Sequence, residues 1–130
     1  MLPKISIIIP SYNNAQLLKR AIQSLINQTF LNWEAIIVDN SSIDNSQLVV
    51  KNFNDIRLKF YIVKNNGIIA YSRNYGIKKS KADVLAFLDS DDWWCNNKLE
   101  TSLKYINKFD LIYHDLPVKY KDKKFINKKS

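Results

Sequence analysis

Short apolar segments recur along this chain, and each is followed by a stretch whose apolar residues have helical spacing. The first, at residues 4–9, contains Ile7, Ile8 and Ile9 with no polar alternation, which is typical of a strand in a parallel sheet covered on both faces. The alternation predicts an α/β fold with a mostly parallel sheet flanked by helices. Further strands are predicted at residues 35–38, 58–63 and 84–88, and helices from about residue 14 to 26, 44 to 53 and 68 to 79.

Local signals set the expected limits of individual elements. Pro10 is expected to end the first strand. The helix after it carries one apolar stripe, formed by Leu18, Ala21, Ile22, Leu25 and Ile26. The end of the chain is predicted to form a helix marked by Leu99, Leu103 and Ile106, a short strand at 111–113, and a lysine-rich hairpin or edge strand at 118–125.

The composition indicates a single globular domain. The chain has 130 residues, of which 46% are hydrophobic and 25% charged, as in ordinary folded domains. It has only two glycines, so folds built on glycine-rich phosphate loops are not expected, and the thiol of its one cysteine, Cys95, is expected to pack rather than react. No leader peptide or membrane-length apolar run is recognised, which predicts a soluble chain in the reducing cytoplasm.

Basic residues are concentrated near the carboxyl terminus. The net charge is +8, and residues 117–130 contain one acid, Asp122, against six lysines: Lys119, Lys121, Lys123, Lys124, Lys128 and Lys129. Such a segment could be attracted to anionic lipid, which predicts peripheral association with the inner face of a membrane. Because the chain is also rich in Asn and Ile, the lysines equally fit a biased coding composition, and nucleic acid is not an expected partner.

Polar residues follow each predicted strand directly. In open parallel sheets, ligands bind outside the carboxyl ends of the strands. We therefore expect four segments to meet and to form the functional site. They are Pro10-Ser11-Tyr12-Asn13, Asp39-Asn40-Ser41-Ser42, Asn65-Asn66-Gly67 and Asp89-Ser90-Asp91-Asp92.

The segment after the fourth strand carries three carboxylates, on Asp89, Asp91 and Asp92. On an exposed rim these groups would repel one another unless a cation lay between them. Hard oxygen ligands favour Mg²⁺ or Mn²⁺ over zinc. The alternative is that the acids cap the helix that follows, since carboxylates are favoured at helix N-termini.

Arg73 has a functional and a structural interpretation. Helical spacing places it on the same face as Ile69 and Ile77, which predicts that its guanidinium points inward and needs an anion. A bound phosphate or a base carbonyl would satisfy it. An ion pair with Asp39 or Asp89 would do so equally.

The aromatic residues near the strand ends are ambiguous in the same way. Tyr12 could stack on a nucleobase or pack in the core. Trp93 and Trp94 are expected to belong to the core and to a pocket wall rather than to take part in chemistry. His114, the one histidine, is expected to be structural.

Taken in order, these segments resemble the amino-terminal half of family 2 glycosyltransferases, which have the GT-A fold. The resemblance covers roughly residues 3–115. It rests on ISIIIPSYN at 5–13, SLINQTF at 24–30, WEAIIVDNSS at 33–42, NG at 66–67, SRNYG at 72–76 and FLDSDDWW at 87–94. It implies a nucleotide-sugar-binding domain at residues 1–116, with the lysine-rich segment 117–130 belonging to the same domain, and a chain truncated on its carboxyl-terminal side.

The resemblance also implies roles for individual residues. Pro10 and Tyr12 would line the nucleoside pocket, Asp39 would lie at the base or ribose, and Arg73 would contact the nucleotide. Residues 89–91 match the family's DxD motif, in which Asp89 would lie toward the ribose, Ser90 between the acids, and Asp91 on the Mn²⁺ or Mg²⁺ ion at the diphosphate. The implied reaction transfers a sugar from a nucleotide-diphosphate sugar to a carbohydrate or lipid-linked acceptor, with inversion.

The chain departs from the family pattern at several positions. Asn40 stands where many members have a second acid, which puts the identity of the nucleotide in question, and Ala82 stands where a glycine is common. An inverting transfer needs a general base. No residue matches the family's base motif among the acids that follow Asp92, which are Glu100, Asp110, Asp115 and Asp122.

Three other functions compete with a glycosyltransferase. The chain could be a non-catalytic module that binds a nucleotide sugar, or that pairs with another chain supplying the acceptor site. A Mg²⁺-dependent phosphatase is disfavoured because its Asp-x-Asp motif normally follows the first strand, whereas here the motif follows the fourth. A dinucleotide-binding dehydrogenase is excluded by the lack of Gly-x-Gly-x-x-Gly after the first strand.

Overall fold

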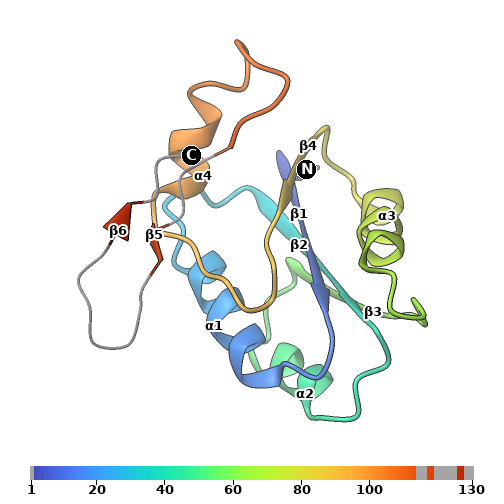
Figure 1. The fold of residues 1–130 in the computed structure, drawn as a ribbon. Coiled ribbons are helices and arrows are strands. Elements are labelled where there is room, and N and C mark those ends of the chain that lie inside the picture. The colour runs from blue at the N-terminus through green and yellow to red at the C-terminus, as the bar shows by residue number, and fades with distance from the viewer. Residues whose placement is uncertain (1, 114–116, 119–125, 128–130) are drawn as a thin grey trace. The chain divides into compact units, whose positions relative to one another are not determined.

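The computed structural model describes residues 2–113, 117–118 and 126–127. The chain divides into two compact units, Met1–Glu100 and Thr101–Ser130, which are described separately. The first contains a four-stranded parallel sheet in the order β3-β2-β1-β4 (Figure 1). The predicted α/β fold with a parallel sheet is therefore confirmed.

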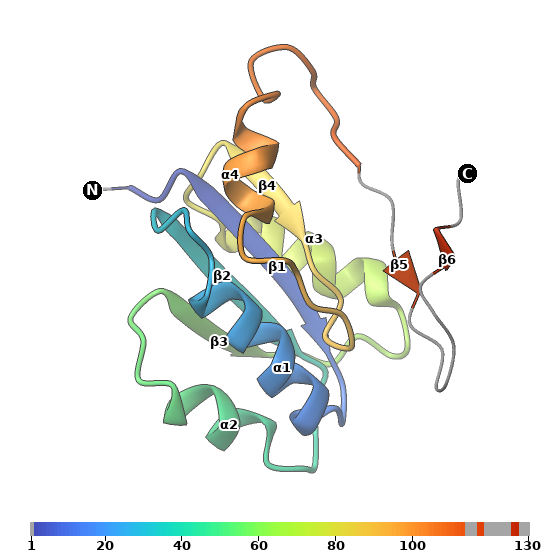
Figure 2. The same cartoon turned by 90° about the vertical axis from the view of Figure 1, so that its left-hand side faces the viewer.

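Strands and helices alternate along the first unit. The strands are β1 (Ile5–Ser11), β2 (Trp33–Asp39), β3 (Leu58–Ile62) and β4 (Val84–Phe87). The helices are α1 (Ala15–Ile26), α2 (Ser46–Asn52), α3 (Ile69–Lys79) and α4 (Lys98–Leu103), the last of which reaches into the second unit. Helices α1 and α2 lie on one face of the sheet and α3 on the other (Figures 1 and 2).

The centre of the core is formed by β1, β2 and α1. Ile7, Ile8 and Ile9 of β1 are completely buried, as expected for a strand covered on both faces. The predicted stripe of α1 is confirmed at Leu18, Ala21, Ile22 and Leu25, which are also completely buried, whereas Ile26 at the end of the helix is half-buried.

The expectation that Pro10 ends the first strand is wrong, because β1 continues to Ser11. The carbonyl of Ile8 accepts from the amide of Leu88, just beyond β4, so the backbone groups of Ile8 face β4. Because these groups alternate between the two sides of a strand, those of Pro10 face the same side as those of Ile8. The paired part of β4 ends opposite Ile8. The amide hydrogen that proline lacks would therefore have had no ladder partner on that side.

Helix α3 packs against β1 and β2 through a glycine. A Cβ atom on Gly76 would lie 2.6 Å from Cγ2 of Ile8, so only glycine permits this close approach. Ser72 and Gly76 form the buried face of the helix. The predicted inward face through Arg73 is consequently wrong, since Ile69 and Ile77 on that face are both exposed.

β4 is apolar throughout, but it is not buried as an apolar strand between two helical layers would be. Among the strands that the structure describes, it pairs only with β1, at the edge of the sheet, and its exposure alternates. Leu85 and Phe87 are exposed, the latter to 48%. Helix α3 packs mainly against β1 and β2, so it leaves these apolar side chains of the edge strand exposed.

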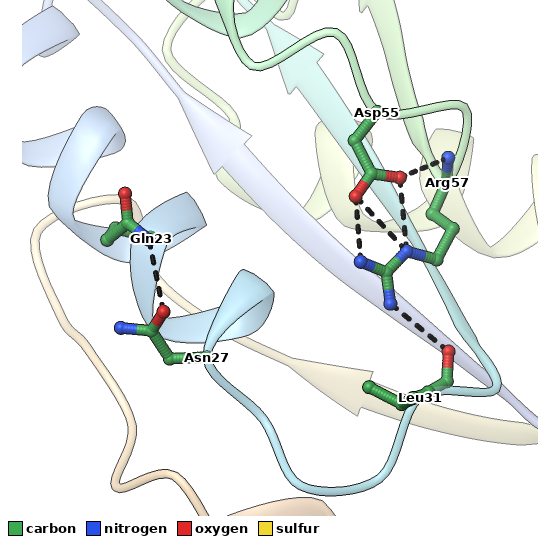
Figure 3. A network of polar contacts seen from close by, with 5 residues as sticks. All are labelled: Gln23, Asn27, Leu31, Asp55 and Arg57. Atoms are coloured by element: carbon green, nitrogen blue, oxygen red, sulfur yellow. Dashed lines mark hydrogen bonds and ion pairs between the residues drawn. The ribbon is translucent and has the colours of Figure 1, made fainter.

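Two polar networks hold the ends of the strands. The carboxylate of Glu34, in β2, accepts from the hydroxyl of Ser6 at 2.6 Å and from the amide of Lys81 at 2.8 Å, which fixes the turn before β4. Arg57 pairs with Asp55 at 2.7 Å and donates to the carbonyl of Leu31 (Figure 3). Its guanidinium also stacks on the ring of Trp33. The second network joins the segments that precede β2 and β3.

The second unit differs from prediction where it can be described. Residues 111–113 are not a strand, and Leu111 and Tyr113 are largely exposed. The expected hairpin lies mostly outside the described residues, but a short antiparallel pair flanks it, formed by β5 (Pro117–Val118) and β6 (Ile126–Asn127). His114 also lies outside the described residues.

Candidate functional site

The carboxyl ends of β1 and β2 bring the first two polar segments together. Pro10 lies opposite Val38 and Ser11 opposite Asp39 in the parallel ladder, and the amide of Asn40 donates to the carbonyl of Ser11. The hydroxyl of Ser11 is buried and has no hydrogen-bond partner among the described residues. The expected meeting of these loops at one edge of the sheet is therefore found.

Asp39 is buried and its carboxylate organises its own loop. One carboxylate oxygen accepts from the hydroxyl of Ser42 at 2.6 Å and the other from the Ser42 amide at 2.7 Å. The same hydroxyl accepts from the amide of Asn13 at 2.8 Å, so the loops after β1 and β2 share a hydrogen bond. Asp39 does not pair with Arg73, which excludes one of the two structural pairs expected for that arginine.

Asp44 ties the same two loops at a second point. Its carboxylate accepts from the amide of Ala15, the first residue of α1, and from the amide and hydroxyl of Ser46 in α2. Desolvation opposes ionisation, but the hydrogen bonds from Ser46 and Ala15 outweigh it and lower the pKa of Asp44. A carboxylate held between two helix N-termini keeps both loops in place.

Tyr12 is displayed rather than packed. Its side chain is 60% exposed, so the interpretation as a core residue is wrong. The next residue, Asn13, has a positive φ of 43°, and its side-chain oxygen accepts from the amide of Ile43. This turn directs the chain from β1 into α1 and leaves the tyrosine ring at the edge of the site.

The loop after β3 is held by asparagines. The side-chain oxygen of Asn40 accepts from the amide of Asn65 at 2.9 Å, and the side-chain amide of Asn65 donates to Ser72 in α3. Gly67 follows with a φ of 78°, the left-handed conformation that favours glycine. Asn40 thus has a structural role in this loop, which sequence reasoning did not predict.

The acid loop, residues 89–92, contains the three carboxylates of the predicted metal site. Asp89, Asp91 and Asp92 are exposed, and each can offer an oxygen within 4.8 Å of the others. Desolvation and the negative charges of Asp91 and Asp89 raise the pKa of Asp92, while Arg20 opposes the rise. The arrangement of hard oxygen ligands fits a divalent cation.

The alternative role of the acids as helix caps is wrong. Helix α4 begins only at Lys98, well beyond Asp92, and the intervening residues form no regular structure apart from a turn. Carboxylate effects on a helix dipole fall off within the first turn. The acids therefore do not stabilise a helix terminus.

Arg73 joins α3 to the acid loop. Its guanidinium donates to the carboxylate of Asp89 at 2.9 Å, and the two side chains are 38% and 51% exposed. This is one of the ion pairs expected from the sequence. Because both groups are open to solvent, the pair is accessible to a ligand.

Helix α1 and the residue before it, Asn14, contribute two side chains to the acid loop that sequence reasoning missed. Asn14 donates to the hydroxyl of Ser90 at 3.2 Å, and Arg20 donates to the carbonyl of Asp91 at 2.6 Å while stacking on the ring of Trp93 at 4.0 Å. The helical pattern places Arg20 off the apolar stripe of α1. No pattern in the sequence indicates what that face contacts.

One cavity lies beside the acid loop, and another lies at the opposite end of the sheet. One of about 200 Å³ is lined by Arg20, Gln23, Ser24, Asn27, Trp93, Trp94 and Asn96. Trp93 and Trp94 thus form a pocket wall as expected, although Trp93 is too exposed to be core. The other, of about 270 Å³, includes Pro3, Trp33 and Arg57. Neither is lined by Tyr12, Asp39 or Arg73.

Cys95 does not pack as expected. It is exposed, and its backbone carbonyl rather than its thiol makes the described contact, accepting from the side-chain amide of Gln28 at 2.7 Å.

In the part of the chain that the structure describes, no helix has the length and apolar character to cross a membrane.

Comparison with known proteins places these features in context. The family model described as glycosyl transferase family 2 matches residues 6–130. The chain is 37% identical over 109 residues to UDP-Glc:alpha-D-GlcNAc-diphosphoundecaprenol beta-1,3-glucosyltransferase WfgD of Escherichia coli, covering 84% of this chain and 43% of that protein. It is 39% identical over 115 residues to poly(ribitol-phosphate) beta-N-acetylglucosaminyltransferase TarP of Staphylococcus aureus, covering 84% and 35%.

The fold is similar to a solved structure. Residues 1–349 of S. aureus TarS, crystallised in complex with UDP-GlcNAc, superpose with a TM-score of 0.73 at 27% identity, covering 81% of this chain and 31% of that one. The chain spans less than half the length of the curated relatives that it matches, for example 16%, 43% and 45% of three of them.

Proposed function

Because this chain belongs to glycosyl transferase family 2, we propose that it binds a nucleotide-diphosphate sugar and takes part in transferring the sugar to an acceptor. The observation that carries the proposal is the acid loop. Three carboxylates within 4.8 Å of one another lie next to Arg73, at the end of the sheet where parallel folds bind ligands. WfgD and the TarS complex, by their names, act on or bind UDP-sugars.

The nucleoside end of the donor is proposed to bind at the ends of β1 and β2. The exposed ring of Tyr12 would stack on the base, next to Pro10. Asp39 would approach the base or ribose while its loop stays closed by Ser42. Each carboxylate oxygen has a second lone pair, so the bonds to Ser42 do not exhaust its capacity to accept.

The diphosphate end is proposed to lie at the acid loop. Asp89 would approach the ribose, Ser90 would support the turn through its bond to Asn14, and Asp91 would hold Mn²⁺ or Mg²⁺, with Asp92 beside it. Such a cation, when bound, neutralises negative charge on the diphosphate oxygens as the sugar departs.

Arg73 supplies the chain's own positive charge to the leaving group. Its pair with Asp89 is exposed, so an incoming phosphate can replace the carboxylate as partner with little loss of free energy. Preorganised cations of this kind stabilise charge that develops in a transition state. The guanidinium would therefore bind the diphosphate more tightly as the glycosidic bond breaks.

The acceptor half of the reaction is proposed only in outline. Inverting transfer needs a carboxylate on the face of the sugar opposite the diphosphate. Glu100 accepts from the hydroxyl of Thr29, in the segment between α1 and β2, at 2.8 Å. We therefore assign no base. The acceptor is proposed to be a carbohydrate or a lipid-linked sugar, and the site of action the inner face of a membrane, to which the lysines of residues 117–130 would be attracted.

A second candidate function is nucleotide-sugar binding without transfer by this chain alone. Two observations favour it. Hydrogen bonds join the loops proposed to bind the nucleotide sugar, and no general base is assigned. Donor binding with no hydrolysis or transfer in any acceptor mixture would support it.

The test is calorimetric titration of the chain with UDP, UDP-glucose and UDP-GlcNAc, each with and without MnCl₂. We expect Mn²⁺-dependent binding that Asp91→Asn abolishes, with the melting temperature unchanged. Asp83→Asn, at the opposite end of β4 and also exposed, is the matched control for the loss of one negative charge. Equal Mn²⁺-dependent binding by Asp91→Asn and the wild type would contradict the proposal.

A further inference from the structure

The segment from the acid loop to α4 lies along helix α1. The segment has no regular secondary structure. Its contacts nevertheless run in the same direction along the segment and along residues 14–29. The hydrogen-bonded pairs are Asn14 with Ser90, Arg20 with Asp91, Ser24 with Trp94, Gln28 with Cys95 and Thr29 with Asn96. Two of these five contacts, at Arg20 and Ser24, come from α1 itself, and the other three come from residues that flank the helix.

Arg20 is the member of this series that contacts the main chain of a proposed metal ligand. Its guanidinium donates to the carbonyl of Asp91 at 2.6 Å. The same group stacks on Trp93, two residues further on, at 4.0 Å from the ring centre. It thus holds the acid loop at two neighbouring points, and the planar guanidinium suits both contacts.

We propose that Arg20 is a positioning residue for divalent-cation binding, acting by holding the backbone of Asp91 so that its carboxylate is already oriented. The inference rests on the proposed function, because it concerns the same acid loop. A loop that is ordered before binding loses less conformational entropy when the cation arrives. Arg20 touches neither donor nor cation in this scheme.

The charge of Arg20 allows a decisive test, because positioning and electrostatics predict opposite signs. A positive charge near the acids repels a cation, so its removal would tighten Mn²⁺ binding if Arg20 acted by charge alone. If Arg20 positions the loop, its removal weakens binding. Partners of this outer kind typically contribute tenfold or more to metal affinity.

The experiment measures binding of MnCl₂, alone and with UDP, to the wild type and to Arg20→Met. We expect Arg20→Met to lower the Mn²⁺ affinity about tenfold. Lys19→Met removes the same charge from the neighbouring exposed position of α1 and is expected to leave the affinity within about twofold of wild type, since exposed charges are screened. Arg20→Lys keeps the charge and is expected to restore part of the affinity.

Amide hydrogen exchange supplies a second measurement that does not depend on the metal. The amide of Trp94 donates to the hydroxyl of Ser24, so it reports whether the segment stays on α1. We expect faster exchange at residues 91–95 in Arg20→Met, without faster exchange in β1. Trp93→Leu removes only the stacking contact and is expected to shift both measurements in the same direction, which keeps the test available if Arg20→Met does not fold.

The outcomes separate the two proposals. Mn²⁺ binding by Arg20→Met as tight as or tighter than wild type, with unchanged exchange, would overturn the positioning role alone. Failure of the wild type to bind either Mn²⁺ or UDP would overturn the proposed function and this inference with it.

Discussion

The guanidinium of Arg73 lies 2.9 Å from the carboxylate of Asp89, and this exposed pair joins a helix on one face of the sheet to the loop that follows the edge strand. Exposed pairs of this kind contribute only about 0.2–1 kcal/mol to folding. The cost of dissolving the pair is therefore small, and a ligand phosphate can compete for the arginine.

Replacing Arg73 with methionine should weaken UDP binding much more than it weakens folding. We expect a loss of UDP affinity of about tenfold or more, because a charge-assisted hydrogen bond contributes about 1.5–3 kcal/mol. The free energy of unfolding should change by less than about 1 kcal/mol. Titration calorimetry and urea denaturation measure the two quantities. Lys78→Met, on the same helix, is the charge control. A collapse of the melting temperature would show instead that the pair is structural.

Tyr12 should matter for nucleotide binding through its ring and not through its hydroxyl. Stacking of a base on an aromatic ring contributes about 1–3 kcal/mol, so Tyr12→Ala should lower UDP affinity about tenfold or more, whereas Tyr12→Phe should bind as wild type. Because the side chain is 60% exposed, neither change should destabilise the fold. Equal UDP affinity of the alanine and phenylalanine variants would contradict the stacking role.

Gly76→Ala should destabilise the protein, although alanine is the better helix former. The new Cβ would lie 2.6 Å from Cγ2 of Ile8, a branched side chain with little freedom to move, and overpacking of this kind costs about 1–3 kcal/mol. Urea denaturation measures the change. Asn74→Ala, exposed on the same helix, should be neutral or stabilising.

A double mutant identifies the cause of that destabilisation. If the clash with Ile8 is responsible, Gly76→Ala combined with Ile8→Ala should be less destabilised than the sum of the two single variants. Strict additivity would mean that the methyl group acts elsewhere.

The free energy of unfolding should depend on pH through Asp55. The hydrogen bond from Arg57 holds the pKa of Asp55 below its ordinary value of 3.8. A carboxylate with a lowered pKa in the folded state stabilises the fold above the unfolded pKa, and this contribution is lost as the pH falls through the folded value. Asp55→Asn should therefore destabilise the protein more at pH 6 than at pH 2.5, which lies below the ordinary pKa of the group.

Urea denaturation of wild type and variant at the two pH values measures this difference. Asp83→Asn is the control for the loss of one exposed carboxylate. A difference between wild type and Asp55→Asn that stays constant from pH 6 to pH 2.5 would exclude the ion pair as its source.

Parts of the site could be predicted because they depend on local pattern. An apolar strand followed at once by Asp89, Asp91 and Asp92 indicates acids at the carboxyl edge of a sheet wherever that strand lies. The meeting of the segments after β1 and β2 follows in the same way, because neighbouring parallel strands end at the same edge of the sheet. The alternative roles of Tyr12 and of the acids could not be decided, because a pattern does not give exposure or the distance to the next helix.

Other features depend on which surfaces meet. The orientation of α3 was predicted wrongly because the spacing of Ile69, Arg73 and Ile77 indicates an apolar face, whereas the small residues Ser72 and Gly76 permit the closest approach to the sheet. The exposure of Phe87 follows from the edge position of β4. Neither fact is a property of the segment itself.

The amino-acid sequence alone determined the alternation of strands and helices along the chain, the parallel sheet and the acids at its rim. Each of these features arises from periodicity or from neighbours in the chain. Only the tertiary structure decided that Arg20 holds the backbone of Asp91, that Arg73 pairs with Asp89 and not Asp39, and that Gly76 lies against Ile8. These contacts join residues far apart in the chain. Their free energies depend on distance and burial, which no local pattern contains.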